Sequence, residues 1–217
     1  MSGTYEALDA IRKGDLERLK KAVESNPALA AGRDEQGVSL LLQALYHRQP
    51  EMVQAMLAHR DELDLFEASA LGHVDAVAHA LGSDPAAIDG FSSDGFTALH
   101  LACFFGNEKT VALLLERGAA LGTMARNPLQ VLPISSAVAG GKVEVVRRLL
   151  AAGADVESRQ AGGFTPLLAA AAGGKREMVE LVLAHGGDRA ARSDDGRSAA
   201  DLARERGHTE IAALLGG

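Results

Sequence analysis

The sequence has few aromatic residues and a single cysteine. Phenylalanine, tyrosine and tryptophan together make up 4% of the 217 residues, and tryptophan is absent. The hydrophobic residues, 47% of the chain, are therefore mainly alanine, leucine and valine, and such small side chains favour closely packed short helices. The lone Cys103 excludes an internal disulfide framework and indicates a reducing compartment.

Net positive charge and long apolar runs are also missing. The formal net charge is −7, which gives no general attraction to phosphate backbones or anionic membranes. No apolar run approaches the roughly 20 residues that a membrane helix requires, and the charged N-terminal stretch lacks the apolar core of a signal peptide. These absences predict a cytoplasmic protein that binds neither nucleic acid nor membrane.

Residue patterns for catalysis are absent as well. No two of the 7 histidines have the i, i+4 spacing of a helical metal pair. The Gly-Gly-Lys triplets at 140–142 and 173–175 lack the Ser or Thr that completes a phosphate-binding loop. No motif near Cys103 would activate its thiol, so we interpret it as a small core residue. The sequence predicts no catalytic residue, no metal ligand and no cofactor.

What the sequence does contain is a repeat anchored on glycine. Six copies place apolar residues five, eight and nine positions after the anchor, which is the spacing of one helix face. A second short apolar segment precedes each anchor, so each unit predicts a helix, a left-handed turn and a helix. The anchors are residues 14, 48, 72, 106, 141, 174 and 207, and only Arg48 is not glycine.

The period and the start of the first helix resemble the ankyrin repeat. Anchors are 33 to 35 residues apart, except for one spacing of 24. Thr97-Ala98-Leu99-His100 and Thr165-Pro166-Leu167-Leu168 each match three of the four positions in the Thr-Pro-Leu-His signature. The resemblance implies an all-α solenoid of about seven helix-turn-helix repeats, with short β-hairpin fingers and polar end caps. It also implies a structural hydrogen-bonding role for His100.

We expect a single ankyrin-repeat domain over residues 1–217, and a monomer. The charged first and last copies are interpreted as caps, which predicts a complete protein rather than a fragment of a longer array. The chain is particularly similar to freestanding bacterial ankyrin proteins, and its 22 basic residues are mostly arginine, as in GC-rich genomes. The expected repeats are approximately 4–33, 34–60, 61–92, 93–126, 127–160, 161–193 and 194–217.

Two departures from the repeat predict local changes. The spacing of 24 leaves only Arg60-Asp61-Glu62 between the second and third repeats, too few residues for a finger. We therefore predict a gap in the row of fingers, which is either an old deletion without function or a notch for a partner's loop. Pro27 and Pro85 each follow an N-cap-type residue, and each predicts a short extra helical turn.

The resemblance implies that a partner binds the concave face, which consists of the finger tips and the exposed ends of the first helices. Two kinds of exposed position are expected, the pair of residues before each anchor and one residue before each first helix. The residues at these positions, together with Phe91 on a finger, predict an aromatic patch with hollows beside Ala139-Gly140 and Ala172-Gly173. Ala70-Leu71 is the pair before the third anchor and is expected to be exposed as well. The alternative is that the phenylalanines pack against neighbouring fingers. The candidate partner-binding residues are Tyr46, His47, Phe91, Phe96, Phe104, Phe105, Val131 and Phe164, with a basic rim of Arg126, Arg159 and Arg192.

The predicted function is a non-catalytic scaffold or regulator that binds an unidentified protein through its concave face. A preorganised groove of this kind lowers the ordering cost of binding. One alternative is a sensor or binder of a small ligand or peptide in the groove beside Phe104 and Phe105. Another is an inhibitor or accessory subunit of an enzyme.

Overall fold

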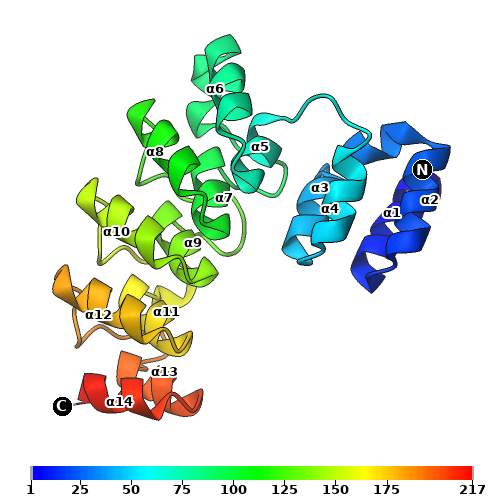
Figure 1. Cartoon of the computed structure of the whole chain (residues 1–217). Coiled ribbons are helices and arrows are strands. Elements are labelled where there is room, and N and C mark those ends of the chain that lie inside the picture. Colours follow the sequence, from blue (N-terminus) through cyan, green and yellow to red (C-terminus); the bar gives the residue numbers. More distant parts are fainter. Residues whose placement is uncertain (1, 217) are drawn as a thin grey trace.

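The computed structural model describes residues 2–216, which form fourteen α-helices in consecutive pairs (Figure 1). The first helices of the pairs are α1 (Ser2–Lys13), α3 (Leu40–Tyr46), α5 (Leu65–Leu71), α7 (Ala98–Phe105), α9 (Pro133–Gly140), α11 (Pro166–Ala172) and α13 (Ala199–Glu205). The second helices are α2 (Leu16–Ser25), α4 (Pro50–Leu57), α6 (Val74–Ser83), α8 (Glu108–Glu116), α10 (Val143–Ala151), α12 (Arg176–Ala184) and α14 (Thr209–Gly216). The predicted all-α solenoid of about seven helix-turn-helix repeats is confirmed.

Local sequence explains where the helices begin and where each pair turns. The Thr97 hydroxyl caps α7 by accepting a hydrogen bond from the His100 N–H, and Ser39 and Ser198 cap α3 and α13 in the same way. Gly106 ends α7 with φ +86°, in the left-handed region that a side chain disfavours. Arg48 takes the same conformation with φ +55°, as the repeat predicts, at a cost of about 1 kcal/mol.

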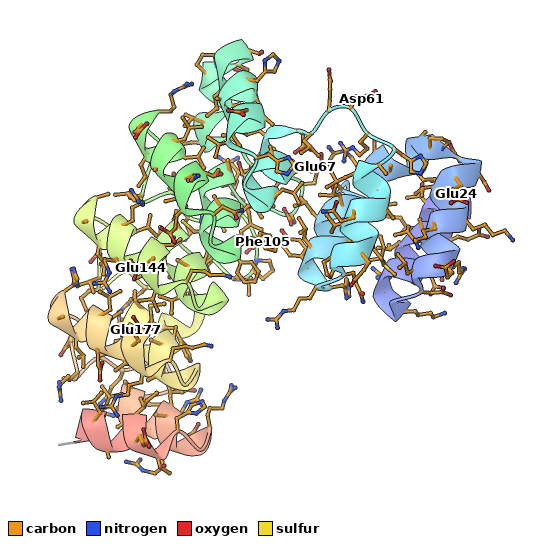
Figure 2. The ribbon with its side chains drawn as sticks, viewed as in Figure 1. Glu24, Asp61, Glu67, Phe105, Glu144 and Glu177 are labelled. Carbon is orange, nitrogen blue, oxygen red and sulfur yellow. The ribbon has the colours of Figure 1, made fainter. Side chains whose placement is uncertain are left out.

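Each second helix has an acidic residue in its first turn. Glu144 lies in the first turn of α10 and Glu177 in that of α12 (Figure 2), and the other second helices follow the same rule. A carboxylate at this position complements the positive end of the helix dipole. These seven carboxylates, of the 29 acidic residues in the chain, therefore have a structural reason.

The connections between repeats are short and varied. The helical turns predicted at Pro27 and Pro85 are confirmed as 3-10 helices, η1 (Pro27–Ala31) and η2 (Pro85–Asp89). A third, η3 (Ala161–Gly163), lies in a finger. Fingers are closed by isolated antiparallel bridges that join Arg33 to Ser39, Gln160 to Phe164 and Arg192 to Ser198. Within residues 2–216 no longer strand forms, so the fingers are turns rather than extended hairpins.

The apolar core is divided into two stacks. Helices α1–α4 share one core, which includes Leu19, Leu41 and Met52, and we call them the N-terminal stack. Helices α5–α14 share a larger core that runs from Leu65 to Leu215, and we call them the C-terminal stack. Figure 1 shows the two stacks set apart along the chain. Helix α3 of the N-terminal stack contacts α5 of the C-terminal stack.

The stacks are joined by a small apolar cluster and by polar contacts. The cluster consists of Val38, Leu42, Ala70 and Leu101, flanked by partly buried aromatic residues. The Arg33 guanidinium donates to the Asp64 carboxylate at 2.7 Å. The Arg60 guanidinium donates twice to the buried Glu67 carboxylate, at 2.7 and 2.8 Å. Figure 2 shows Glu67 on α5 below the connection that carries Asp61.

The missing finger bends the solenoid. The described connection before α5 contains no bridge, as the spacing of 24 predicts. The predicted gap is narrowed, however, because the finger before α3 meets the finger before α7. A side-chain carbon at Gly37 would lie 2.9 Å from the Ser93 hydroxyl, and the Tyr46 hydroxyl donates to Asp94 at 2.7 Å. The row of fingers is thus one unit shorter than the row of helices, and α3 faces α7.

This bend corrects one expectation about exposure. Ala70, in the pair before the third anchor, is expected on the open concave face, but it is only 3% exposed. The reason is that Val38 and Leu42 from the second repeat and Leu101 from the fourth pack over it. At this position the third repeat therefore packs between the second and fourth repeats and adds no exposed surface to the concave face.

Candidate functional site

Two adjoining pockets lie where α3 faces α7. The first has a volume of about 320 Å3 and is lined by Tyr46, Phe96, His100, Leu101, Phe104, Leu129, Val131, Ser136 and Ala139; we call it the apolar pocket. The second has a volume of about 680 Å3 and is lined by Leu45, Tyr46, Arg48, Gln49, Pro50, Val53, Phe104, Phe105, Ala139, Gly140, Lys142 and Lys175; we call it the cationic pocket. They share Tyr46, Phe104 and Ala139, and together they form the central groove.

Aromatic contacts across the bend form the wall of the groove. The rings of Tyr46 and Phe105 stack with centroids 5.9 Å apart, and Phe105 meets Phe104 edge to face at 5.1 Å. Both arrangements are attractive for aromatic rings. Figure 2 shows Phe105 between α7 and α3. The groove therefore has a wall built from residues of the second and fourth repeats.

Tyr46 is held by a polar contact at its outer end. Its hydroxyl donates to the Asp94 carboxylate at 2.7 Å. Burial raises the pKa of the Tyr46 phenol above its ordinary value, and the charge of Asp94 and this hydrogen bond raise it further. The ring is consequently a neutral, fixed part of the groove.

The two phenylalanines before Gly106 differ in exposure. Phe104 is 36% exposed and lines both pockets. Phe105 is half-buried and packs with the cluster that joins the stacks. Phe104 is thus available to a partner, whereas Phe105 mainly supports the bend.

The floor of the apolar pocket depends on His100. Its Nδ1 accepts from the Thr97 hydroxyl at 2.8 Å, and its Nε2 donates to the Val131 carbonyl at 3.0 Å. Burial lowers the pKa of His100 to about 4, although the bond to Val131 opposes this shift, so the ring is neutral at pH 7. The structural role implied for His100 is confirmed. Cys103 is buried, and burial raises the pKa of its thiol, which agrees with its interpretation as a core residue.

Close packing of α9 on α7 forms the hollow beside Phe104. Gly140 allows this approach, because a side chain there would collide with the Phe104 carbonyl. Ala139, next to it, is exposed and lines both pockets. The hollow expected beside Ala139-Gly140 is therefore present.

Three cations line the second pocket. They are Arg48, which is the non-glycine anchor, and Lys142 and Lys175, which directly follow the anchors of the fifth and sixth repeats. None of the three forms an ion pair among the residues that the structure describes. The methylene stem of Lys142 lies over Gly106, where a side chain would meet it at 2.6 Å.

Several candidate residues are not where they were expected. Val131 lines the apolar pocket but is only 8% exposed, because it packs into the pocket floor above His100. Phe164 packs against the C-terminal core and lines neither pocket. The ring of Phe91 lies under the Arg126 guanidinium, 4.0 Å from its centroid, beside a separate pocket of about 270 Å3 between fingers. The predicted patch of phenylalanines is thus divided, and His47 is exposed beside it.

The finger arginines have contacts of their own. Arg159 donates to the Gly163 carbonyl at 3.2 Å and Arg192 to the Gly196 carbonyl at 2.9 Å, as Arg33 does to the Gly37 carbonyl at 3.1 Å. Arg159 also reaches the Arg192 carbonyl, 3.1 Å away on the next finger. These bonds close the fingers and link them, and they give Arg159 and Arg192 a structural role. The basic rim of Arg126, Arg159 and Arg192 stays a prediction.

Sequence reasoning missed several residues of the groove, and four of them matter most for its chemistry. Leu129 is an exposed aliphatic residue that follows Asn127-Pro128 on a finger and lines the apolar pocket. Arg48, Lys142 and Lys175 were seen only as repeat positions. The signal available in the sequence was that some copies, and not others, carry a cation at the anchor or directly after it.

Other kinds of site are not evident in the part of the chain that the structure describes. Across residues 2–216, no helix combines the length and apolar character needed to cross a membrane. No cluster of three or more metal-ligating side chains occurs among the same residues.

Comparison with known proteins gives one family. The family model for ankyrin repeats (3 copies) matches residues 7–125, 65–160 and 134–216. The chain is 38% identical over 97 residues to the probable E3 ubiquitin-protein ligase XBOS31 of Oryza sativa subsp. japonica, which covers 44% of this chain and 21% of that protein. It is 34% identical over 152 residues to the transient receptor potential cation channel subfamily A member 1 homolog of Caenorhabditis elegans, which covers 70% of this chain and 12% of that protein.

A third relative is the ankyrin repeat and KH domain-containing protein mask of Drosophila melanogaster. It is 47% identical over 62 residues, which cover 29% of this chain and 2% of that protein. The chain thus spans about a fifth or less of the length of these relatives. All three are eukaryotic, so they give no support to the expected similarity to bacterial proteins.

Proposed function

The chain belongs to the ankyrin repeat family, and from this premise we propose that it binds a partner protein through the central groove. Ankyrin repeats are generally protein–protein interaction modules, and the fold is typically non-catalytic. The activities that the relatives' names state belong to proteins of which this chain matches only a small part. The proposal therefore rests on the surface of this chain.

The observation that carries the proposal is the continuous groove between the two stacks. Its apolar pocket has exposed Phe104 and Leu129 at its edge and buried Leu101 and Val131 below. Apolar surface that is open to solvent and bordered by charged residues marks interaction sites. Aromatic residues in such places contribute most of the binding energy in protein interfaces. A partner side chain placed beside Phe104 would bury this surface.

The proposal is tested by capturing partners from a cell lysate with matched variants. Phe104→Asp places a charge in the groove, and Met124→Asp makes the same change at another exposed apolar residue. Phe104 is 36% and Met124 46% exposed, and Met124 lines neither pocket of the groove. Both variants should keep the wild-type circular dichroism spectrum and a cooperative melt. A partner retained by wild type and Met124→Asp, and at least tenfold less by Phe104→Asp, supports the groove.

The opposite result would be equally clear. Equal retention of the same partner by all three proteins would place the interface outside the groove. A photo-crosslinking residue at Ala139 gives an independent check, because Ala139 lines both pockets. The crosslink should form to the partner from position 139 and not from position 124.

A small ligand in the apolar pocket is a second candidate function. The volume of about 320 Å3 lies at the lower end of the usual range for small-molecule sites, roughly 300–1,000 Å3. A library of small apolar compounds would then raise the melting temperature of wild type and leave that of Phe104→Asp unchanged. No stable protein partner would be expected in that case.

A further inference from the structure

We propose that the central groove binds an acidic peptide segment that carries one bulky apolar side chain. The apolar side chain would occupy the apolar pocket, and the carboxylates would lie against Arg48, Lys142 and Lys175. This inference rests on the proposed function and specifies the chemistry of the partner. Any partner protein that presents such a segment, in a loop or a tail, would satisfy it.

The sign of the charge in the groove is the first argument. Every charged residue that lines either of its pockets is cationic at pH 7, since His100 is neutral there. The chain as a whole has a formal net charge of −7. A cationic groove in an acidic protein therefore departs from the average surface. Within a Debye length of roughly 8–10 Å these local charges dominate what a bound peptide experiences.

The second argument is that these cations are not used by the fold. At the position after the anchor, Asn107 donates from its side-chain amide to the Ser69 and Ala70 carbonyls, each at 2.8 Å, and so joins two repeats. Lys142 and Lys175 occupy the same position in the two following repeats. They make no such bond and no ion pair in the described part of the chain. Their ammonium groups are available to an external carboxylate.

Arg48 adds a third cation where the repeat favours glycine. Its left-handed backbone is one that a side chain disfavours, and the six other anchors are all glycine. Arg48 lies in the N-terminal stack, while both lysines lie in the C-terminal stack. The cations therefore line the cationic pocket from both sides of the bend. A carboxylate between them would also offset the mutual repulsion of the three cations.

The arrangement of the two pockets favours a peptide over a compact molecule. The apolar pocket has room for about one large side chain, and no ionised residue lines it. The three cations lie on the other side of Phe104, in the cationic pocket. A ligand that uses both must extend past Phe104 with an apolar group at one end and carboxylates along its length. An acidic peptide with a single aromatic or aliphatic anchor has this chemistry.

The test is a selection of random 12-residue peptides displayed on phage against three purified proteins. They are wild type, the charge-reversed Lys142→Glu/Lys175→Glu variant, and the control Lys21→Glu/Arg117→Glu. The control makes the same change in net charge at two exposed cations that line neither pocket and form no ion pair in the described chain. The readouts are the mean net charge of the enriched peptides and the frequency of a bulky apolar residue.

We expect wild type and the control to enrich acidic peptides with one bulky apolar residue. The charge-reversed variant should lose the acidic bias. For the best peptide, Phe104→Asp and the charge reversal should each weaken binding at least tenfold by fluorescence anisotropy. The effect of the charge reversal alone should shrink in high salt.

Other outcomes separate this inference from the proposed function. Peptides without an acidic bias whose binding requires Phe104 would overturn the inference and leave the proposed function standing. An acidic bias that survives the charge reversal would also overturn the inference. Enrichment of no peptide on any of the three proteins would count against both. Dodecanoate serves as an acyl carboxylate probe. If dodecanoate binds the groove and no peptide does, the groove would be assigned to a small amphiphile instead of a peptide.

Discussion

Tyr46, in the N-terminal stack, contacts both helix α7 of the C-terminal stack and the finger that precedes α7. Its ring stacks on Phe105, and its hydroxyl bonds to Asp94, residues that lie in the fourth repeat. The chain has only one other tyrosine, Tyr5 on α1. The ionisation of Tyr46 can therefore be followed alone in a Tyr5→Phe background, and it reports directly on whether the bend is closed in solution.

In Tyr5→Phe, Tyr46 should not ionise at the ordinary phenol value of 10.0 while the protein stays folded. Burial disfavours the phenolate, and the nearby Asp94 carboxylate adds repulsion. Absorbance at 295 nm measured against pH, with circular dichroism in parallel, should show ionisation only with alkaline unfolding. Adding Asp94→Asn should move it to lower pH, but only in part, because burial is the larger cause. A reversible titration near pH 10 with an unchanged circular dichroism spectrum would contradict the closed bend.

At the scale of an element, the connection Arg60-Asp61-Glu62 shows what the sequence could and could not predict. The helix pairs, the left-handed Arg48 and the turns at Pro27 and Pro85 depend on residues close in the chain, and all were predictable. The spacing of 24 also predicted a missing finger. It did not show that the neighbouring fingers would meet, because that depends on contacts such as Tyr46 with Asp94, 48 residues apart.

The same limit applies to the candidate site. Phe104 was predictable because it keeps the exposure that its position before the anchor implies for a single repeat, whereas Ala70 at the same position is covered by its neighbours. Val131 and Phe164 were misplaced because their burial is decided by packing against neighbouring helices and fingers. The cations were missed because the bend brings Arg48 opposite Lys142 and Lys175, which lie three and four repeats further along the chain. The repeat period predicts the structure of each single repeat, whereas the groove forms at the irregular spacing between the second and third repeats.

Glu67→Gln should destabilise the protein by about 3 kcal/mol at pH 7, because it leaves the buried Arg60 guanidinium without its carboxylate. Burial raises the pKa of Glu67, but hydrogen bonds from Arg60, Ser39 and the Asp64 N–H outweigh this and hold it below 4.5. The stabilisation is therefore complete above about pH 4.5 and is lost as the pH falls through the folded-state value. Urea denaturation of both proteins between pH 7 and pH 3 measures this.

The difference in stability between wild type and Glu67→Gln should thus shrink in acid. Glu62→Gln is the matched control, because Glu62 is exposed on the same connection and forms no ion pair in the described chain. It should change stability by less than about 0.5 kcal/mol. A difference for Glu67→Gln that stays constant with pH would show that the ion pair does not hold the connection.

At the scale of the whole molecule, the bend separates two cores that differ in size. The N-terminal stack has four helices and the C-terminal stack has ten (Figure 1). They are joined by the four-residue buried cluster and by the contacts of Arg33, Tyr46 and Arg60. The stability of a solenoid is approximately the sum of its units and of the interfaces between neighbours. An interface this small makes the N-terminal stack the less stable part, and its position opposite Phe104 means that its opening would also open the groove.

Hydrogen exchange followed by mass spectrometry should therefore show faster exchange in α3 and α4 than in α7, α9 and α11. Glu67→Gln should widen the difference by speeding exchange in α1–α4 while leaving α9–α12 unchanged. Leu202→Ala, a buried change at the far end of the C-terminal stack, should instead speed α13 and α14 and leave α1–α4 as they were. If both variants speed exchange equally throughout the chain, the solenoid opens as one cooperative unit. The groove would then be a fixed surface that is already formed before a partner binds, and it would not depend on the docking of the two stacks.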